Sequence, residues 1–297
     1  MLVTPRPGVN RKNLRDTLNS VYTDASNLRG GGPRGSYNRL LAYLDWTSSA
    51  VRILSSQISS ADLDRLVLTR RYELLLAGVG NMAGDQQEVQ RVVSGLVSTE
   101  LDQRIAAFEE AIKALDEQIN RWSGLMDFVM PDSSFYIHHP DKLEVADFAL
   151  LLKLVWTDHP IHVLVPIVVV DELDRLKESK DRTVRWRAGY TVAVLDRMFE
   201  STTGVATLRK PEISAREPSV VTRGPVTIEL LFDAPGHIRL PINDDEIIDR
   251  ALAVESLAAR GVTLITYDTG QSTRARMAGL QAVKLSKPIE EEPTTGE

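Results

Sequence analysis

The spacing of apolar residues changes once along the chain, near residue 124, and this change restricts the fold more than any other feature. In the first part, apolar residues recur at helical spacing, as in Leu101, Ile105 and Phe108. In the second part, short apolar runs alternate with helical segments, which is typical of βαβ units. The sequence therefore predicts an all-α domain over residues 1–124 and an α/β domain with a mostly parallel sheet over residues 125–287.

Local patterns place the individual elements. A continuous apolar stripe predicts one long helix over 98–122, and the acidic segment 288–297, with its Pro, Thr and Gly, is predicted to be disordered. We expect residues 226–232 to form a hairpin insertion with residues 237–240 across Asp233-Ala-Pro-Gly. The expected strands lie at 127–130, 161–165, 206–208, 226–232 and 262–266, and the expected helices of the second domain at 143–154, 167–178, 188–199, 246–260 and 273–278.

Composition excludes several classes of protein. The chain has no cysteine, so disulfides, thiolate catalysis and Cys-ligated metal centres are ruled out, and a metal must be held by oxygen or histidine. No apolar run approaches ~18 residues and no secretion signal is visible, so we expect a cytoplasmic protein that does not interact with membranes. The net charge of −6 argues against an extended nucleic-acid groove but allows a local basic patch.

Four acidic residues stand out because each follows an expected strand or begins an expected helix. They are Asp132, Glu172, Asp244 and Asp268. Asp132 and Asp268 follow strands, while Glu172 and Asp244 are expected in the first turns of helices, where the helix dipole favours anions. Such carboxylates can meet at one edge of a parallel sheet, where their repulsion is costly unless a divalent cation neutralises it. Because water and phosphate can complete an octahedron, Mg²⁺ or Mn²⁺ fits this set better than Ca²⁺.

Each acid also has a structural interpretation. An Asp after a strand often only caps the next helix, as Asp132 would, and Glu172 can form a surface pair with Arg175. The third acid is open among Asp244, Asp245 and Asp249. We favour Asp244 and treat Asp245 as an auxiliary metal ligand.

Other residues near these acids are candidates for substrate contact. Arg274 and Arg276 follow Asp268 and can neutralise a phosphate, and Lys177 belongs to a basic segment that can track phosphates beyond Glu172. A solvated helix end explains that segment nearly as well. Two hydroxyl residues that flank the acids complete the predicted substrate contacts, namely Ser133 and Thr266.

The order of the acidic motifs resembles that of the PIN domain, a nuclease fold. The matching elements are Asp132-Ser-Ser, the helix Pro166-Ile-Val-Val-Val-Asp-Glu-Leu, Asn243-Asp-Asp with the helix that follows it, and Thr266-Tyr-Asp. The resemblance covers residues 125–287 and looks closer to the larger PIN domains of RNA-decay factors than to compact toxin versions. It implies a three-layer α/β/α fold and a metal-dependent endoribonuclease acting on single-stranded RNA, with Asp132, Glu172, Asp244 and Asp268 as catalytic metal ligands; DNA is not excluded.

Two other functions remain open. One is another magnesium-dependent phosphate hydrolase, such as a haloacid-dehalogenase-type phosphatase, although Asp132-Ser-Ser does not supply the Asp-x-Asp of that class. The other is a regulatory or nucleic-acid-binding protein that kept the fold without robust catalysis. An active cluster should hold at least one carboxyl whose pKa is well above its ordinary value when no metal is bound. The helical domain is expected to provide specificity, through a protein partner or a homo-oligomer.

Overall fold

The computed structural model describes residues 3, 5–6, 8–32, 34–83, 86–155, 157–200, 204–213, 221–233 and 237–286. The chain forms two compact units, Met1–Ser123 with Ser256–Ala259, and Gly124–Glu255 with Arg260–Glu297. The segment 288–297, predicted to be disordered, lies outside the described residues. No described helix combines the length and the apolar character that crossing a membrane requires.

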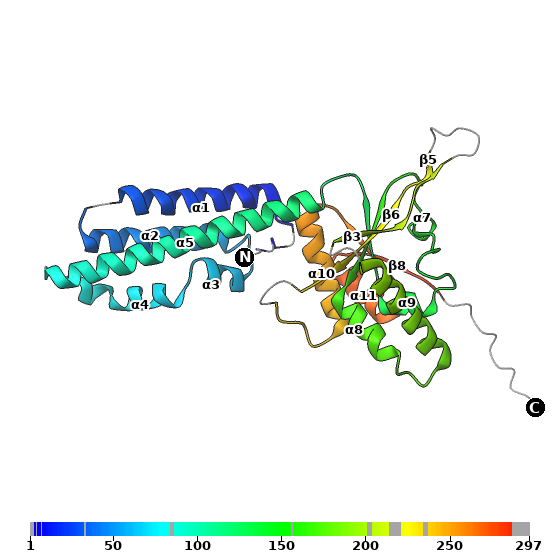
Figure 1. The fold of residues 1–297 in the computed structure, drawn as a ribbon. Coiled ribbons are helices and arrows are strands. Elements are labelled where there is room, and N and C mark those ends of the chain that lie inside the picture. The colour runs from blue at the N-terminus through cyan, green and yellow to red at the C-terminus, as the bar shows by residue number, and fades with distance from the viewer. Residues whose placement is uncertain are drawn as a thin grey trace, which may run out of the picture. The chain divides into compact units, whose positions relative to one another are not determined.

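The first unit is helical, as predicted. Helices α1 and α2 both pack along α5, and Figure 1 shows the three running side by side. Helix α5 begins at Gln87, about three turns before residue 98, and the buried Val93 and Val97 continue its apolar stripe into this extension. The elements are α1 (Arg11–Gly31), α2 (Ser36–Leu54), α3 (Ser60–Leu66), α4 (Arg70–Gly78), the 3₁₀ turn η1 (Val79–Met82) and α5 (Gln87–Arg121).

Aromatic side chains fill the core of this helical unit. Trp46 stacks on Tyr43 with ring centroids 5.9 Å apart, and Phe108 of α5 meets Trp46 edge-on at 6.2 Å. The indole Nε1 of Trp46 donates to the carbonyl of Val21, 3.2 Å away, so its polar end is satisfied inside the core. These aromatic residues therefore pack the bundle.

The second unit is built on a six-stranded sheet in the order β3-β6-β2-β1-β7-β8, in which only β3 runs antiparallel to its neighbour. The strands are β1 (Asp127–Pro131), β2 (Ile161–Pro166), β3 (Val205–Arg209), β6 (Val226–Leu231), β7 (Val262–Thr266) and β8 (Gln281–Lys284); β4 (Glu212–Ile213) and β5 (Val221–Arg223) form a separate antiparallel pair. The helices are α6 (Ser133–His138), α7 (Phe148–Leu151), α8 (Ile167–Leu176), α9 (Arg182–Phe199), α10 (Asn243–Ala258) and α11 (Thr269–Met277).

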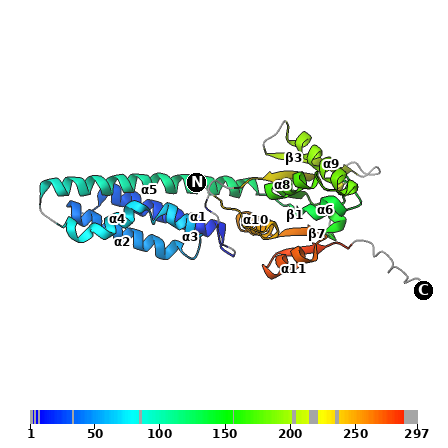
Figure 2. The same ribbon diagram turned by 90° about the horizontal axis from the view of Figure 1, so that it is seen from below.

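The direction of the connections places the helices in two outer layers. The chain passes from β1 to β2 and then β6 in one direction across the sheet, and from β7 to β8 in the other. Because parallel crossovers are right-handed, this reversal places the two sets of helices on opposite faces. Figure 2 shows α8 and α9 on one side of the sheet and α11 on the other. The expected three-layer α/β/α fold is confirmed.

Some element boundaries differ from the predictions. Helix α9 begins at Arg182 and α11 at Thr269, in both cases because an Asp (Asp181 or Asp268) caps the helix earlier than the apolar pattern indicates. The helix expected over 143–154 is reduced to the four residues of α7, and Lys153 just after it has a left-handed backbone with φ of 54°. Strand β8 and helix α6 were not predicted.

The expected hairpin between 226–232 and 237–240 is wrong. Strand β6 pairs instead with β2 in parallel and with β3 antiparallel, and residues 237–240 are not in a strand. A hairpin-like extension is present nearby, in the antiparallel pair β4 and β5 between β3 and β6. Both sides of β6 are occupied by strands, so no edge is left for residues 237–240.

Strand β7 offers a test of this core because Leu264 is fully buried at its centre, while its neighbour Thr263 is only half-buried. Leu264→Ala should lower the free energy of unfolding by about 2–5 kcal/mol, and Thr263→Ala by less than about 0.5 kcal/mol. Urea unfolding followed by circular dichroism measures both values. Equal values for the two variants would contradict the placement of β7.

Candidate functional site

The order in which the chain adds strands to the sheet changes direction between β1 and β7, so their carboxyl ends lie at the switch point of the sheet. The two strands are adjacent and parallel, with Pro131 opposite Ile265. The helices that follow them, α6 and α11, leave toward different neighbours, and ligands of open α/β sheets bind in the crevice that such a reversal creates. Asp132 directly follows β1, and Asp268 follows β7 by two residues. The sheet therefore brings these two predicted acids to one edge.

Asp132 is buried, with 2% of its surface exposed, and each hydrogen bond that its carboxylate accepts from the described residues comes from an uncharged donor. One oxygen, Oδ1, accepts from the backbone N of Phe135 at 3.0 Å, which caps α6, and from Ser134 Oγ at 2.6 Å. The other, Oδ2, accepts from the hydroxyl of Thr266. Residues of α6 and of β7 thus fix the orientation of this carboxylate.

Thr266 and Ser134 connect the two strand ends. The Thr266 hydroxyl also accepts from the backbone N of Asp268 at 2.8 Å, and Ser134 Oγ accepts from the backbone N of Tyr267 at 2.8 Å. Thr266 is fully buried, so it supports the acids and does not meet substrate as we expected. Ser134 makes the contacts to Asp132, while its neighbour Ser133 is the first residue of α6.

Asp268 caps α11 by accepting from the backbone N of Gln271 at 3.0 Å. Asp268 is exposed at the rim of the crevice, whereas Asp132 is buried. Because a cap occupies only part of a carboxylate, Asp268 retains oxygen lone pairs that face solvent. It can serve as both a helix cap and a ligand.

Gln271 joins Asp132 to Asp244. The side chain of Gln271 is 2% exposed, and with its amide nitrogen turned toward the acids it donates to Asp132 Oδ2 at 3.3 Å and to Asp244 Oδ1 at 2.9 Å. Asp244 lies in the first turn of α10, as predicted. Burial raises the pKa of Asp244, and the negative charge of Asp268 raises it further. Asp244 is therefore close to two of the other acids.

The other two acids considered as the third metal ligand, Asp245 and Asp249, pair with arginines. Asp245 accepts from Arg274 at 2.8 Å, and Asp249 pairs with Arg250. The geometry thus favours Asp244 among the three acids of this helix, and Asp245 is engaged by an arginine.

Glu172 belongs to α8, but not to its first turn as expected. The helix begins at Ile167, so Glu172 is its sixth residue, and the first turn contains no acid. The charge of Glu172 contributes to raising the pKa of Asp132, which shows that the two carboxylates are near one another. Glu172 is half-buried and approaches from the layer of helices that contains α6, α8 and α9.

The electrostatics of Asp132 match the expectation for an active cluster. Burial raises its pKa from 3.8 to about 6, against the opposing effect of the hydrogen bonds from Ser134, Thr266 and Phe135, and the charge of Glu172 adds to the rise. At neutral pH the folded protein therefore loses free energy of stabilisation by keeping Asp132 ionised.

The predicted basic residues form no ion pair with the four acids, but the positive charge of Arg274 lowers the pKa of Asp244 and so opposes the effects of burial and of Asp268. Lys177 pairs with Asp174 at 2.6 Å, and Arg274 with Asp245. Arg276 lies at the other end of the sheet, where it lines a cavity with Asp127 and Gln281, which begin β1 and β8. Its expected contact with substrate at the acids is therefore wrong, because α11 runs back toward the strand starts. Within the described part of the chain, no Lys or Arg forms an ion pair with Asp132, Glu172, Asp244 or Asp268.

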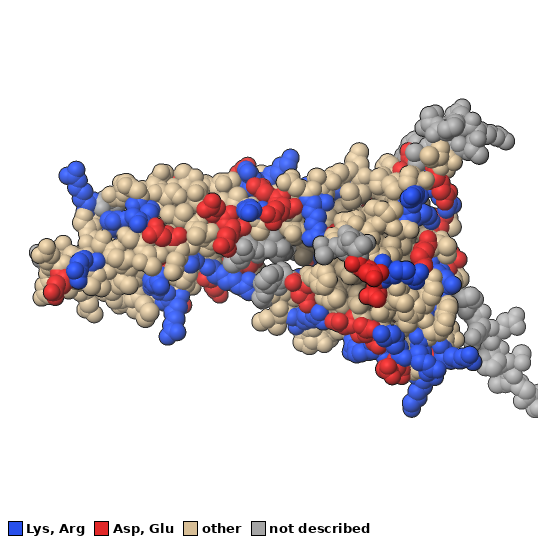
Figure 3. Space-filling model, viewed as in Figure 1, with Lys and Arg blue, Asp and Glu red and all other residues tan. Residues whose placement is uncertain are grey.

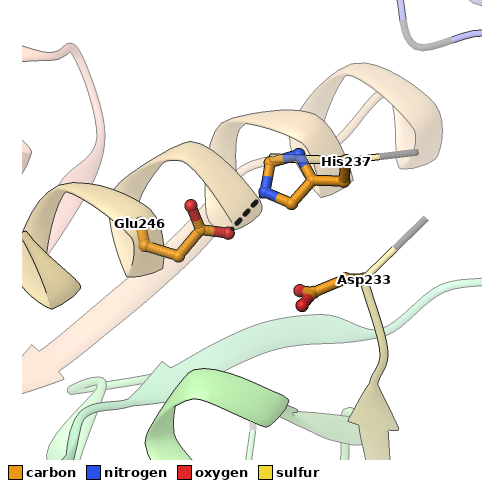
Figure 4. Close-up of side chains that lie close together, drawn as sticks. All are labelled: Asp233, His237 and Glu246. Carbon is orange, nitrogen blue, oxygen red and sulfur yellow. Dashed lines mark hydrogen bonds and ion pairs between the residues drawn. The ribbon is translucent and has the colours of Figure 1, made fainter. Parts of the chain in front are cut away.

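A second group of possible ligands was not predicted. Asp233, His237 and Glu246 place one donor atom each within 4.8 Å of one another, closer than any three of the four predicted acids come among the described residues. Figure 4 shows His237 meeting Glu246, with Nε2 2.7 Å from Oε1. The histidine could not be assigned from sequence because it is nine residues from Glu246, in a segment that we had expected to form a strand.

This second group is already neutralised by the protein. Arg239 donates to Asp233 at 2.6 Å, and Arg250 lies 3.3 Å from Glu246 and 3.2 Å from His237 Nδ1. The backbone N of Leu240 also donates to Glu246 at 2.8 Å. Two guanidinium groups beside these ligands oppose a bound cation, so the group anchors the segment 237–240 to α10.

Comparison with known proteins agrees with the architecture. A family model described as the PIN domain matches residues 129–286, which includes all four predicted acids. A search of curated proteins found no match to the chain.

The raised pKa of Asp132 has a measurable effect on stability. Because the pKa is about 6 in the folded state and near 3.8 when unfolded, its contribution to stability is complete below about pH 4 and is lost as the pH rises through 6. At about 1.4 kcal/mol per pKa unit, the loss is about 3 kcal/mol. In EDTA, Asp132→Asn should therefore gain stability relative to wild type between pH 4 and pH 7.

Urea unfolding at several pH values measures this difference. Asp249→Asn, an acid of the neighbouring helix that pairs with Arg250, is the matched control and should show no comparable gain. A difference between Asp132→Asn and wild type that does not change with pH would contradict the burial of an ionised Asp132.

Proposed function

Because the chain belongs to the PIN-domain family, a nuclease superfamily, we propose that it is a metal-dependent endoribonuclease that cleaves single-stranded RNA. One observation carries the proposal: acids from four separate segments gather at the carboxyl edge of the sheet, and no described Lys or Arg pairs with them. Neighbouring carboxylates that have no ion-pair partner favour a multivalent cation.

The donor set fits a hard divalent ion. Asp132, Glu172, Asp244 and Asp268 offer only carboxylate oxygens, which Mg²⁺ and Mn²⁺ prefer. The buried Asp132, whose hydrogen-bond donors are all neutral, is the acid that gains most from such an ion. When bound, the ion supplies Lewis-acid stabilisation of charge on the phosphate and lowers the pKa of an attacking water. No nucleophilic side chain is then required.

The protein's own residues position this set. Thr266 and Ser134 fix the orientation of Asp132. The amide group of Gln271 donates to both Asp132 and Asp244 and so restricts the distance between the two carboxylates. Pre-organised ligands reduce the rearrangement that binding requires. Asp268 and Glu172 are less enclosed, so they can adapt to the ion and to the substrate phosphate.

The choice of RNA as substrate rests on the resemblance to the PIN domains of RNA-decay factors. The carboxylates and the metal act on phosphodiesters of either polymer, because discrimination requires contact with the 2′-hydroxyl. Matched RNA and DNA strands therefore belong in the same assay.

The proposal predicts metal-dependent cleavage that needs Asp132 and Asp268. Purified protein should cut labelled single-stranded RNA with Mn²⁺ or Mg²⁺ but not with EDTA. The double variant Asp132→Asn, Asp268→Asn should lose at least about 100-fold in rate, because it removes charge stabilisation at the reacting phosphate.

Two variants serve as controls in this assay. Asp249→Asn changes an acid of α10 that pairs with Arg250, and His237→Gln removes the histidine of the second ligand group. Both should keep activity within a few-fold of wild type. Cleavage that survives the double variant but is lost with His237→Gln would move the active centre to the second group, and a folded wild type that never cuts either polymer would reject catalysis.

A further inference from the structure

Helix α9 presents two aromatic rings on the side of the helix that does not face the core. Trp186 and Tyr190, one turn apart, stack with ring centroids 5.4 Å apart and an interplanar angle of 24°. The buried residues of α9 are Ala188, Thr191, Val194 and Leu195, on a different face. Trp186 is 53% exposed, so about half of a large apolar ring remains in contact with water.

A lysine from a different segment joins the two rings. Lys142, in the loop after α6, places its ammonium 4.5 Å from the centroid of Tyr190 and 5.6 Å from that of Trp186. The hydroxyl of Tyr190 donates to Glu144 at 2.7 Å, which fixes its ring. The result is a pre-formed aromatic surface with a positive charge beside it. An aromatic pair at this spacing contributes little to helix stability by itself, so packing alone does not explain the exposed indole.

The surface is connected to the acidic cluster by direct contacts. Arg187, next to Trp186, donates to the backbone carbonyls of Tyr136, at 3.1 Å, and of His139. Both residues belong to α6 or its end, and α6 begins directly after Asp132. His139 Nδ1 also lies 3.2 Å from the hydroxyl of Tyr267, the residue before Asp268. At about 1.5 Å per helical residue, the six residues of α6 span only about 9 Å.

The surrounding charge favours a polyanion. Figure 3 shows blue side chains over the region of α8 and α9, with red ones among them. Several acids in this region already have partners. Asp181 caps α9, Asp174 pairs with Lys177, Glu144 accepts from the Tyr190 hydroxyl, and Asp141 lies 3.8 Å from His139 Nε2. The exposed basic residues of the segment that leads into α9 and its first turn are Lys180, Arg182 and Arg185.

We propose that Trp186, Tyr190 and Lys142 form a base-stacking platform for the single strand whose phosphate enters the acidic cluster. This rests on the proposed nuclease function. Aromatic faces flanked by cations bind unpaired bases without strict sequence preference, because every base has a flat π surface. The platform would then hold nucleotides beside the scissile bond and discriminate against duplexes, whose bases are already stacked.

Binding can be separated from cleavage by working in EDTA. The probe is a labelled oligouridine of about 12 nucleotides. Fluorescence anisotropy measures the Kd of its complex with the full-length protein. Trp186→Ala should raise Kd about 5- to 150-fold, the range for loss of one stacked base. Trp186→Phe, which keeps a ring, should lose less. Met277→Ala is the matched control, since Met277 is 85% exposed on α11, across the sheet.

A second probe separates stacking from charge. A strand of the same length with abasic sites keeps the phosphates but offers nothing to stack, so wild type and Trp186→Ala should bind it equally. In cleavage assays with metal, Trp186→Ala should raise KM and leave kcat nearly unchanged, because the indole does not touch the reacting atoms.

The outcomes distinguish the platform from the nuclease proposal. Equal Kd values for wild type and Trp186→Ala with the normal strand would overturn the platform, whether or not Asp132-dependent cleavage occurs. So would a Trp186→Ala variant that loses self-association or a protein partner but binds the strand normally. Weakened binding by Trp186→Ala without any metal-dependent cleavage would support the platform and reject the nuclease.

Discussion

The hydrogen bond that Thr266 donates to Asp132 connects the carboxyl ends of two strands that are more than 130 residues apart in the chain. It forms only if β1 and β7 pair in parallel with Pro131 opposite Ile265. The same hydroxyl accepts from the backbone N of Asp268, so the register of two strands determines where both acids lie. The positions of α6 and α11 follow, because Asp132 and Asp268 are the caps of these helices.

This arrangement fixes the geometry of the acidic cluster but makes the ionised form of Asp132 less stable. A carboxylate that is buried among hydroxyl and amide groups has its conformation fixed but loses solvation, and the raised pKa of Asp132 reports that loss. The second group, Asp233, His237 and Glu246, has the opposite character, since two arginines compensate its acids. Proximity of ligand atoms alone would favour the second group as the metal site; we propose the first group because no described Lys or Arg forms an ion pair with its acids.

Much of the fold followed from sequence because its central strands are continuous apolar runs. Strand β7 was predicted with its observed bounds, and the acids at strand ends followed from the same pattern. The pattern failed where polar residues decide the structure. Asp181 extends α9 beyond its apolar stripe, and the short strand β8, Gln281 to Lys284, has no alternation strong enough to detect.

The parts of the site that sequence could not predict depend on contacts between distant segments. Gln271 lies on α11 with no motif to mark it, yet its amide reaches Asp132, which follows β1, and Asp244 of α10. Arg274 and Arg276 look equivalent in sequence, but one turns to Asp245 and the other to the opposite end of the sheet. Only the packing of α11 against β7 and β8 separates them.

We propose that the divalent ion is held by Asp132, Glu172, Asp244 and Asp268, and not by the group that Arg239 and Arg250 neutralise. Anomalous diffraction from crystals of the protein soaked in Mn²⁺ tests this proposal directly. We expect an anomalous peak within about 2.0–2.6 Å of carboxylate oxygens of Asp132 and of at least one of Asp244, Asp268 and Glu172. A peak at His237 and Glu246 with none beside Asp132 would contradict it.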